Sequence, residues 1–273
     1  MKNNKKKIIW LGLITVFILI CFVGILTNED ETILIQLSAQ GPRQMMGYIL
    51  KTENDEIIVI DGGTTDDTEN LVKHLNNLGG KVDYWFLTHA HDDHAGAFVE
   101  IVENTQIEIE NIYVSLNSFE WYVQNEKLRI EFSEKLINVL ENSRISEVVS
   151  TPKVNDSIKI DNINVEILKV ISPEVTENAG NEQSMVLKFT TDNSSILFLG
   201  DLGIYGSDWL IQNKKDKLDS DIVQMSHHGQ DGATEELYSI ISPEICLWPT
   251  PDWLWNNDNG GGYNSRKLEN FGD

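Results

Sequence analysis

The sequence predicts an α/β domain preceded by one separate apolar helix. Three observations support this fold class. After residue 32, short strand-like runs alternate with helix-like runs, polar clusters follow several of the strands, and residues 8–26 contain no ionisable side chain. Alternating strands and helices are typical of α/β folds. We therefore expect residues 1–31 to form an anchor with a short stem, and residues 32–273 to form a single domain.

Residues 1–31 are predicted to place one helix across a membrane. Lysines precede the apolar stretch Ile8–Leu26, and an acidic group begins after it at Glu29. A helix of this length spans roughly 28 Å, close to the ~30 Å hydrocarbon core of a bilayer. Lysines favour the cytoplasmic side, so we expect a single-pass protein of a bacterial-type cell membrane with residues 32–273 outside. A cleaved signal peptide is the rival interpretation, but its apolar core is usually only ~7–15 residues long.

Strands are predicted where short runs rich in β-branched and aromatic residues are bounded by turn residues. These runs are 33–37, 46–51, 56–60, 84–87, 112–116, 185–190, 196–199 and 221–225. Residues 185–190 and 196–199 are expected to pair as a hairpin around the polar residues 191–194. Within a further β region, residues 159–167 alternate apolar and polar side chains, which predicts one half-buried strand.

Helices are predicted at residues 64–78 and 132–140, and another is expected to begin at residue 265. In the first helix, Leu71 and Leu75 belong to an apolar stripe, and glycines after residue 78 end the helix. His74 lies beside this stripe, and we expect it on the helix surface without a catalytic part.

One loop carries most of the chemistry. Thr88-His89-Ala90-His91-Asp92-Asp93-His94 follows the apolar run 84–87 and holds three of the six histidines in the chain. Imidazole and carboxylate groups are the usual protein ligands of zinc and similar ions. The spacing H-x-H-x-D-H therefore predicts a metal site, and the plain alternative is a polar surface loop.

Three further polar clusters follow predicted strands. They are Asp61-Gly62-Gly63, Gly200-Asp201 and His227-His228-Gly229. Glycines beside the polar residues let the backbone turn sharply and pass close to an ion. No serine lies in a G-x-S-x-G elbow and no phosphate-binding glycine loop is present, so no other catalytic arrangement competes.

With these motifs in this order, residues 33–248 resemble the metallo-β-lactamase superfamily. The resemblance implies a four-layer αββα sandwich and two divalent metal ions, with zinc expected and manganese as the alternative. The implied ligands are His89 and His91 for the first ion, Asp93, His94 and His227 for the second, and Asp201 for both. His228 is then expected to act on the substrate or carry a proton, although the resemblance leaves His227 and His228 interchangeable. Asp61 matches a family aspartate that supports the histidine loop.

The sequence departs from many family members at one ligand. No histidine stands between Ala95 and His227, where a further imidazole often completes the first site, and residues 181–184 read Asn-Glu-Gln-Ser. In this the chain is similar to nuclease-like domains of bacterial DNA-uptake proteins and to bacterial phosphorylcholine esterases. The resemblance implies an exported metal-dependent hydrolase, in which Asp93 and Asp201 hold a metal-bridging hydroxide for attack on a phosphodiester. The open position on the first ion could accept a phosphate oxygen.

Two alternatives stay open. The same fold could hydrolyse a lactone, thioester or β-lactam, because one scaffold carries many chemistries. The chain could also be a non-catalytic binding module at the cell surface with a degenerate site.

Composition restricts the partners. A formal net charge of −22 repels nucleic-acid phosphates, so nucleic acid is a possible but disfavoured partner, and a small or polymeric phosphodiester remains the expected substrate. Acidity that serves only solubility is an equal alternative. Cys21 lies in the apolar stretch and Cys246 is the only other cysteine, so residues 32–273 must be stabilised by core burial and metal. No protein partner follows from the sequence.

The C-terminal segment is rich in tryptophan. Residues 248–255 contain three of the seven tryptophans. Such aromatic rings could stack on a base or enclose a choline-like cation, but we favour the interpretation that they cover the sheet edge. Related proteins usually continue with a closing strand, so we expect the sequence to be truncated.

Overall fold

The computed structural model describes residues 31–256 and 258. Its contacts divide the chain into Met1–Glu31 and Thr32–Asp273, and only the second unit is described below. The expected membrane anchor at residues 8–26 and the expected helix from residue 265 lie outside the described residues. Among the described residues, no helix combines the length and apolar character needed to cross a bilayer.

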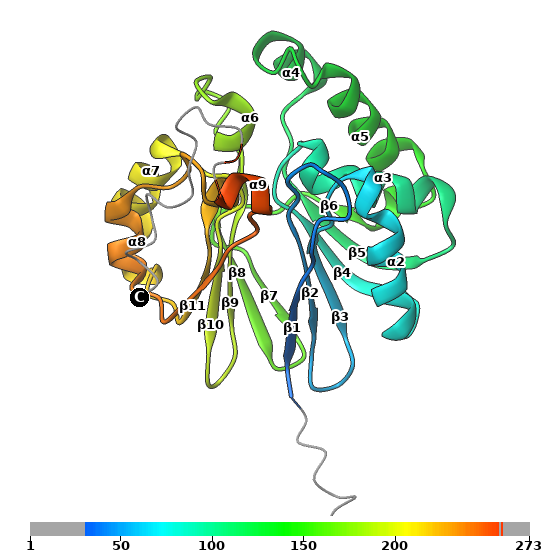
Figure 1. Ribbon diagram of the computed structural model, residues 1–273, viewed down its shortest axis with the longest axis horizontal. Helices are drawn as coiled ribbons and strands as arrows, with labels where there is room; N and C mark the ends of the chain where they lie inside the picture. Colours follow the sequence, from blue (N-terminus) through cyan, green and yellow to red (C-terminus); the bar gives the residue numbers. More distant parts are fainter. Residues whose placement is uncertain (1–30, 257, 259–273) are drawn as a thin grey trace, which may run out of the picture. The chain divides into compact units, whose positions relative to one another are not determined.

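Two six-stranded mixed sheets form the centre of the domain (Figure 1). The first sheet contains, in spatial order, β1 (Ile33–Gln36), β2 (Gly47–Lys51), β3 (Ile57–Asp61), β4 (Lys81–Leu87), β5 (Glu108–Val114) and β6 (Val149–Ser150). The second contains β12 (Ile245–Leu247), β11 (Ile222–Gln224), β10 (Ser195–Phe198), β9 (Val186–Thr190), β8 (Ile163–Lys169) and β7 (Ser157–Ile160). Each sheet has an antiparallel part and a parallel part. The parallel pairing begins between β3 and β4 in the first sheet and between β10 and β11 in the second.

Helices cover the outer faces of the two sheets. On the first sheet lie α2 (Thr68–Asn77), α3 (Asp92–Asn104) and α5 (Ile130–Asn142), with α4 (Phe119–Asn125) at its upper end in Figure 1. On the second lie α7 (Ile204–Lys214) and α8 (Glu235–Ile241). The short helices α6 (Ala179–Glu182) and α9 (Asp252–Trp255) lie at the same end as α4. Three separate apolar cores fill the spaces between these layers, which confirms the expected αββα arrangement.

The apolar runs of the first sheet reflect burial on both faces. In β3, Ile57 and Val59 pack toward the helices, whereas Ile58 and Ile60 pack toward the second sheet. In β4, Trp85 and Phe86 divide in the same way. A strand covered on both faces needs apolar side chains at every position, so these strands could be recognised from composition.

Several boundaries differ from the sequence expectations. Residues 159–167 do not form one strand, because Asp161 adopts a left-handed conformation (φ 49°) and turns the chain into the β7–β8 hairpin. The hairpin expected around residues 191–194 is confirmed as β9–β10. The predicted strand at 112–116 lies earlier, at Glu108–Val114, and the predicted helix at 132–140 extends over Ile130–Asn142.

Candidate metal centre

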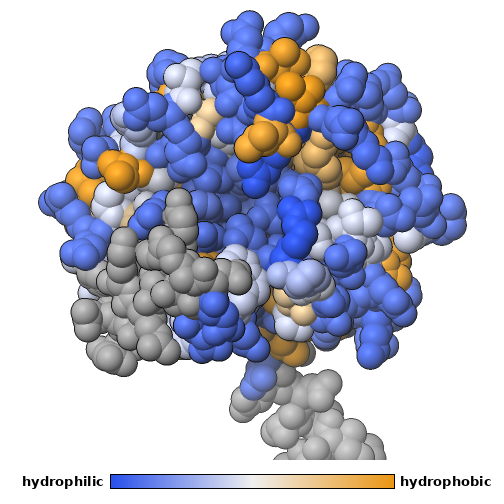
Figure 2. Space-filling view, turned by 45° about the horizontal axis from the view of Figure 1, so that its top comes forward, coloured by the Kyte–Doolittle hydropathy of each residue, from blue (hydrophilic) through white to orange (hydrophobic). Residues whose placement is uncertain are grey.

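The polar clusters meet at one edge of the sandwich because they follow neighbouring parallel strands. Asp61 ends β3 and the histidine motif follows β4, whereas Asp201 follows β10 and His228 follows β11. Carboxyl ends of parallel strands point the same way, so residues distant in sequence gather there. Figure 2 turns this edge toward the viewer, and mainly hydrophilic residues line the hollow near its centre.

The histidine motif is only partly a loop. His91 is extended (φ −95°, ψ 149°) and caps α3, so Asp93 and His94 lie in the first helical turn. This turn is fixed against the strand ends, because Gly63 donates to the His94 carbonyl at 3.2 Å and Ala97 donates to the Gly63 carbonyl at 3.0 Å. The change of conformation within the motif directs its side chains to a common centre.

Two overlapping groups of ligand atoms result. The groups are His89, His94 and Asp201, and Asp93, His94 and His228, with all ligand atoms of a group within 4.8 Å of one another. His94 Nε2 lies 3.2 Å from Asp201 Oδ1, and His228 Nε2 lies 3.5 Å from Asp93 Oδ2. Asp201 also lies 3.6 Å from His228 Nε2, so it contacts both groups.

The buried atoms of the cluster that lack hydrogen-bond partners are of the kinds that bind metal ions. Five buried atoms of these two groups have no hydrogen-bond partner: His89 Nε2, Asp93 Oδ1, His94 Nε2, Asp201 Oδ1 and His228 Nε2. His91 Nε2 also has none, but His91 belongs to neither group, and its Nε2 lies 3.5 Å from Glu126 Oε2. A buried polar atom without a partner is costly, and native proteins keep few of them. Imidazole nitrogens and carboxylate oxygens converging without partners are the donor set that divalent zinc prefers. The residues present therefore fit the predicted ions.

Asp61 supports the cluster from behind, at the position expected for it. Its carboxylate accepts hydrogen bonds from the Thr88 amide and the Thr88 hydroxyl, both at 2.8 Å. Asp61 Oδ2, which accepts from the Thr88 hydroxyl, also lies 2.7 Å from His94 Nδ1. With Nδ1 bound in this way, His94 turns Nε2 toward Asp201, which is the usual arrangement of a supported ligand histidine.

The structure exchanges our assignments of His227 and His228. Both have left-handed backbones (φ 51° and 54°), so their side chains leave the turn in different directions. His228 is fully buried, with Nδ1 at 3.0 Å from the Pro249 carbonyl and Nε2 facing the aspartates. His227 points instead toward Asn181, whose Nδ2 lies 3.3 Å from its Nε2. His228 therefore belongs to a group of atoms that could hold an ion, whereas His227 lies beside the cluster.

Charge balance within the cluster sets its protonation. Burial lowers the pKa of His228, but Asp201 and Asp93 outweigh it and raise this pKa to about 9. Burial also lowers the pKa of His94, but the charges of Asp201 and Asp61 outweigh it and raise this pKa well above its ordinary value. Burial and the neighbouring His94 lower the pKa of His89 well below its ordinary value. The metal-free cluster thus holds protons on His94 and His228 but not on His89.

The carboxylates of the cluster remain ionised. Burial raises the pKa of Asp93, but the His228 imidazole 3.5 Å away and the charge of His94 outweigh it and hold this pKa well below the usual range. At Asp201, burial is outweighed in the same direction by the charges of His94 and His228.

Residues 181–184, which the sequence analysis set against a further family histidine, bring small polar groups to the cluster. Ser184 Oγ lies 3.4 Å from His89 Nδ1 and accepts a hydrogen bond from the Asp201 amide at 3.0 Å. Gly180 leaves room for His91, because a Cβ there would lie 2.1 Å from His91 Nε2. This segment therefore borders the cluster without supplying an imidazole.

Two site residues were missed by sequence reasoning. Gln44 Nε2 donates to Asp93 Oδ2 at 3.1 Å, and Glu126 Oε2 lies 3.5 Å from His91 Nε2. Both lie in connecting segments outside any motif, so nothing in the sequence marks them.

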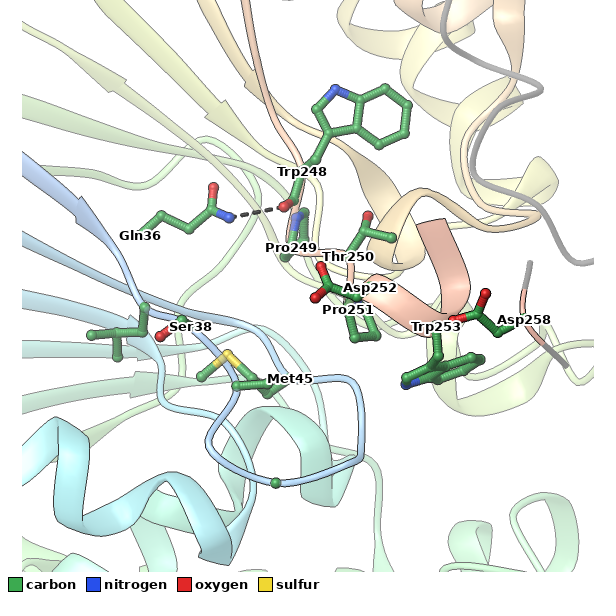
Figure 3. Close-up of a pocket in the computed structure, with 13 residues that line it drawn as sticks. Gln36, Ser38, Met45, Trp248, Pro249, Thr250, Pro251, Asp252, Trp253 and Asp258 are labelled. Carbon is green, nitrogen blue, oxygen red and sulfur yellow. Dashed lines mark hydrogen bonds between the residues drawn. The ribbon is translucent and has the colours of Figure 1, made fainter. Parts of the chain in front are cut away.

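The tryptophan-rich segment borders a cavity of ≈ 570 Å³ beside the β1–β2 connection (Figure 3). Trp248 and Trp253 lie on either side of the turn Pro249–Pro251. Trp248 packs edge-on against Trp255, with ring centroids 5.3 Å apart, and covers Gly229. This packing supports the covering role that we favoured for Trp248, whereas Trp253 faces cavities.

Comparisons with known proteins agree with this site. A family model described as the metallo-beta-lactamase superfamily matches residues 41–237. The chain therefore belongs to the metallo-β-lactamase superfamily, whose members are generally metal-dependent hydrolases. A search of curated proteins found no match.

One solved structure shares the fold, and others are similar at lower TM-scores. The metallo-beta-lactamase fold protein YhfI from Bacillus subtilis has a TM-score of 0.51 at 14% identity, over 87% of this chain and 92% of that one. A metallo-beta-lactamase from Staphylococcus aureus has a TM-score of 0.45 at 17% identity, over 71% and 53% of the two chains. Zinc-bound PqqB from Methylobacterium extorquens has a TM-score of 0.43 at 10% identity, over 67% and 60%. At these identities the likeness concerns the fold alone.

Proposed function

We propose that this protein is a membrane-tethered, extracytoplasmic hydrolase that cleaves a phosphodiester with two divalent metal ions, expected to be zinc. The observation that carries the proposal is the pair of overlapping groups of buried ligand atoms at the edge of the sandwich, formed by His89, His94 and Asp201 and by Asp93, His94 and His228. Ser184 and Asn181 stand where many relatives have another histidine, which favours a phosphodiester over a β-lactam. The tether rests on the apolar stretch at residues 8–26.

The first ion would be held by His89, His91 and Asp201, and the second by Asp93, His94 and His228, with Asp201 shared. Bound there, two such ions supply Lewis acidity and a nucleophile at neutral pH.

The residues around this set orient it and move protons. Asp61 fixes His94, the Pro249 carbonyl fixes His228, and Gln44 fixes Asp93. His227 is suited to proton transfer, because burial lowers its pKa and keeps its imidazole neutral at pH 7. The Asn181 amide donates toward His227 Nε2, which marks Nε2 as the basic nitrogen. Placed at the rim, His227 can take or return a proton during ester cleavage.

Turnover of bis-p-nitrophenyl phosphate by the purified protein tests the proposal. We expect p-nitrophenol release with zinc or manganese, abolished by a chelator and restored by adding the ion back. Asp201→Asn removes the shared carboxylate, whereas Asp216→Asn makes the same change at an exposed position and serves as its control. A metal-loaded protein that leaves the phosphodiester intact contradicts the proposal, and much faster hydrolysis of a lactone would favour the alternative substrate class.

A further inference from the structure

Two arginines meet at one carboxylate beside the metal centre. Arg43 lies in the β1–β2 connection, Arg129 immediately precedes α5, and Asp92 is the first residue of α3. Arg43 Nη1 donates to Asp92 Oδ2 at 2.6 Å, and Arg129 Nε lies 3.6 Å from Asp92 Oδ1. Three segments distant in sequence therefore place two positive groups around a single negative one.

These arginines line a cavity that adjoins the predicted ligands. The cavity measures ≈ 530 Å³, and its lining includes Gln44, Asp93 and Trp253 as well as the two arginines. Gln44, which follows Arg43 in the chain, donates to Asp93 at 3.1 Å. Asp93 thus lines the cavity and is also one of the predicted metal ligands.

The arrangement is not explained by stability alone. The side chains of Arg43, Arg129 and Asp92 are 51%, 34% and 28% exposed, and exposed ion pairs contribute little to folding. Each guanidinium has five N–H groups, and the single carboxylate between them cannot satisfy all of these. By contrast, the described Arg144 donates to the backbone carbonyls of Val102 and Ile107, a purely structural use.

The scarcity of arginine strengthens this point. The chain has only four arginines among 21 basic residues, against 43 acidic ones, and two of the four line this cavity. Arginine is the residue whose planar fork matches phosphate oxygens in pairs, which a lysine ammonium does not.

We propose that Arg43 and Arg129 form a subsite for a second phosphate group on the substrate, adjacent to the bond cleaved at the metal centre. Asp92 orients the two guanidinium groups and leaves N–H groups directed to solvent. Trp253 forms part of the cavity wall, and the body of the substrate lies against this wall. The inference rests on the proposed function for the scissile bond and specifies its substrate class, a phosphodiester that carries an additional phosphate.

A matched pair of substrates tests the subsite. Thymidine 5′-(p-nitrophenyl phosphate) and its 3′-phosphorylated form release the same chromophore and differ only in the second phosphate. We expect the zinc-loaded full chain to prefer the phosphorylated form by about tenfold in kcat/KM, the size of about one charge-assisted hydrogen bond. Arg43→Gln and Arg129→Gln should bring this ratio close to one.

Lys127→Gln is the matched control. Lys127 is exposed, lies two residues from Arg129, and its replacement removes the same charge. The ratio should stay at its wild-type value in this variant. A ratio that is equal in all four proteins, or that Lys127→Gln lowers as much as the arginine variants do, overturns the subsite.

Binding separates this inference from the proposed function. Calorimetry compares thymidine 3′,5′-bisphosphate with thymidine 5′-phosphate on the zinc-loaded chain, without any turnover. A bisphosphate preference that depends on Arg43 and Arg129, in a protein that hydrolyses neither ester, retains the subsite and refutes the phosphodiesterase. Turnover without any effect of the arginines on either measurement retains the phosphodiesterase and refutes the subsite.

Discussion

At the scale of single residues, each central imidazole is oriented through the nitrogen that faces away from the cluster. His94 Nδ1 contacts Asp61 at 2.7 Å, His228 Nδ1 contacts the Pro249 carbonyl at 3.0 Å, and His89 Nδ1 contacts the Thr88 hydroxyl at 3.1 Å. All three Nε2 atoms are thereby left without hydrogen-bond partners. Such outer contacts set ring orientation and basicity, so metal affinity depends on residues that do not touch metal.

Asp61→Asn should weaken zinc binding by about 10- to 100-fold, because it replaces the carboxylate that orients His94. Asparagine tolerates the left-handed backbone of this position (φ 55°), so the fold should persist. Competition with a chromogenic chelator measures the affinity. Asp161→Asn is the control, since Asp161 has a similar backbone (φ 49°) in the β7–β8 turn. Equal zinc affinities in the two variants would show that Asp61 does not support zinc binding.

His227 and His228 should respond differently to alanine substitution. His228→Ala removes a buried ligand atom and should lower the zinc content from about two ions to about one per chain. His227→Ala should keep both ions and reduce phosphodiester turnover, by about 10²- to 10⁴-fold if it transfers a proton. Elemental analysis and kinetics on the same samples distinguish the two roles. The opposite pattern would make His227 the ligand and His228 the residue that transfers a proton, as the sequence analysis assigned them.

Zinc affinity should rise with pH. In the metal-free protein, His94 and His228 hold protons because their pKa values are raised, that of His228 to about 9. Zinc must displace these protons, so competition is strongest at low pH. Below about pH 9, affinity should increase about tenfold per pH unit through loss of the His228 proton, and the His94 proton should steepen this increase. Asp93 and Asp201 stay ionised throughout and add no dependence. Chelator-buffered titrations across this range test the slope, and a flat profile would contradict it.

At the scale of elements, α3 determines whether the motif can form the cluster. Its second and third residues, Asp93 and His94, are two of the six proposed ligands, so any shift of the helix moves both. The helix lies close to the β3–α2 turn because Gly96 has no side chain. A Cβ at Gly96 would lie 2.9 Å from the Thr65 amide nitrogen and 3.0 Å from two backbone carbons of Thr64.

Gly96→Ala should therefore destabilise the protein even though alanine favours helices. The gain in propensity is at most ~1 kcal/mol, whereas overpacking against rigid backbone typically costs about 1–3 kcal/mol. We expect a lower midpoint of urea unfolding together with weaker zinc binding. Glu103→Ala, at an exposed position of α3, is the control and should change stability little. An unchanged midpoint for Gly96→Ala would show that α3 does not require this close contact.

Elements with a simple burial pattern could be predicted from sequence, and the others could not. Strands β3 and β4 contain the apolar runs 57–60 and 84–87 because both of their faces are covered, so these runs were evident. Helix α7 has little separation of apolar and polar faces, and α8 is only seven residues long, so periodicity marked neither. The turn at Asp161 interrupts an alternating pattern that continues through it, which made two strands look like one.

Some residues of the candidate site could likewise be predicted from the sequence, and others could not. The ligands in the histidine motif, and Asp201 by its place after a strand, could be predicted because chemistry and spacing coincide. The choice between His227 and His228 depends on side-chain direction in a left-handed turn, which the sequence does not encode locally. Gln44 and Arg43 enter the site through a connection whose path is set by tertiary packing, so no sequence pattern indicated them.

At the scale of the whole molecule, the site exists only when the two sheets are packed together. The first sheet supplies Asp61 and the histidine motif, and the second supplies Asp201 and His228. Metal bound across this junction is linked to folding, because the unfolded chain has no such site. The proposed activity is thus a property of the closed sandwich and not of either half.

The proposed tether gives a prediction at this scale. The full chain, expressed in a bacterial host, should sediment with membranes and resist alkaline carbonate extraction, because residues 8–26 provide the length and apolarity of a spanning helix. Removing residues 1–31 should release the domain into the soluble fraction with its metal content unchanged. A full chain that stays soluble would disprove the tether and leave the metal centre untouched.

Anomalous diffraction at the zinc edge, from crystals of the zinc-loaded protein, tests the central claim most directly. We expect two peaks at the edge of the sandwich, one among His89, His91 and Asp201 and one among Asp93, His94 and His228. No peak at this edge, with these imidazoles hydrogen-bonded to other partners, would contradict it.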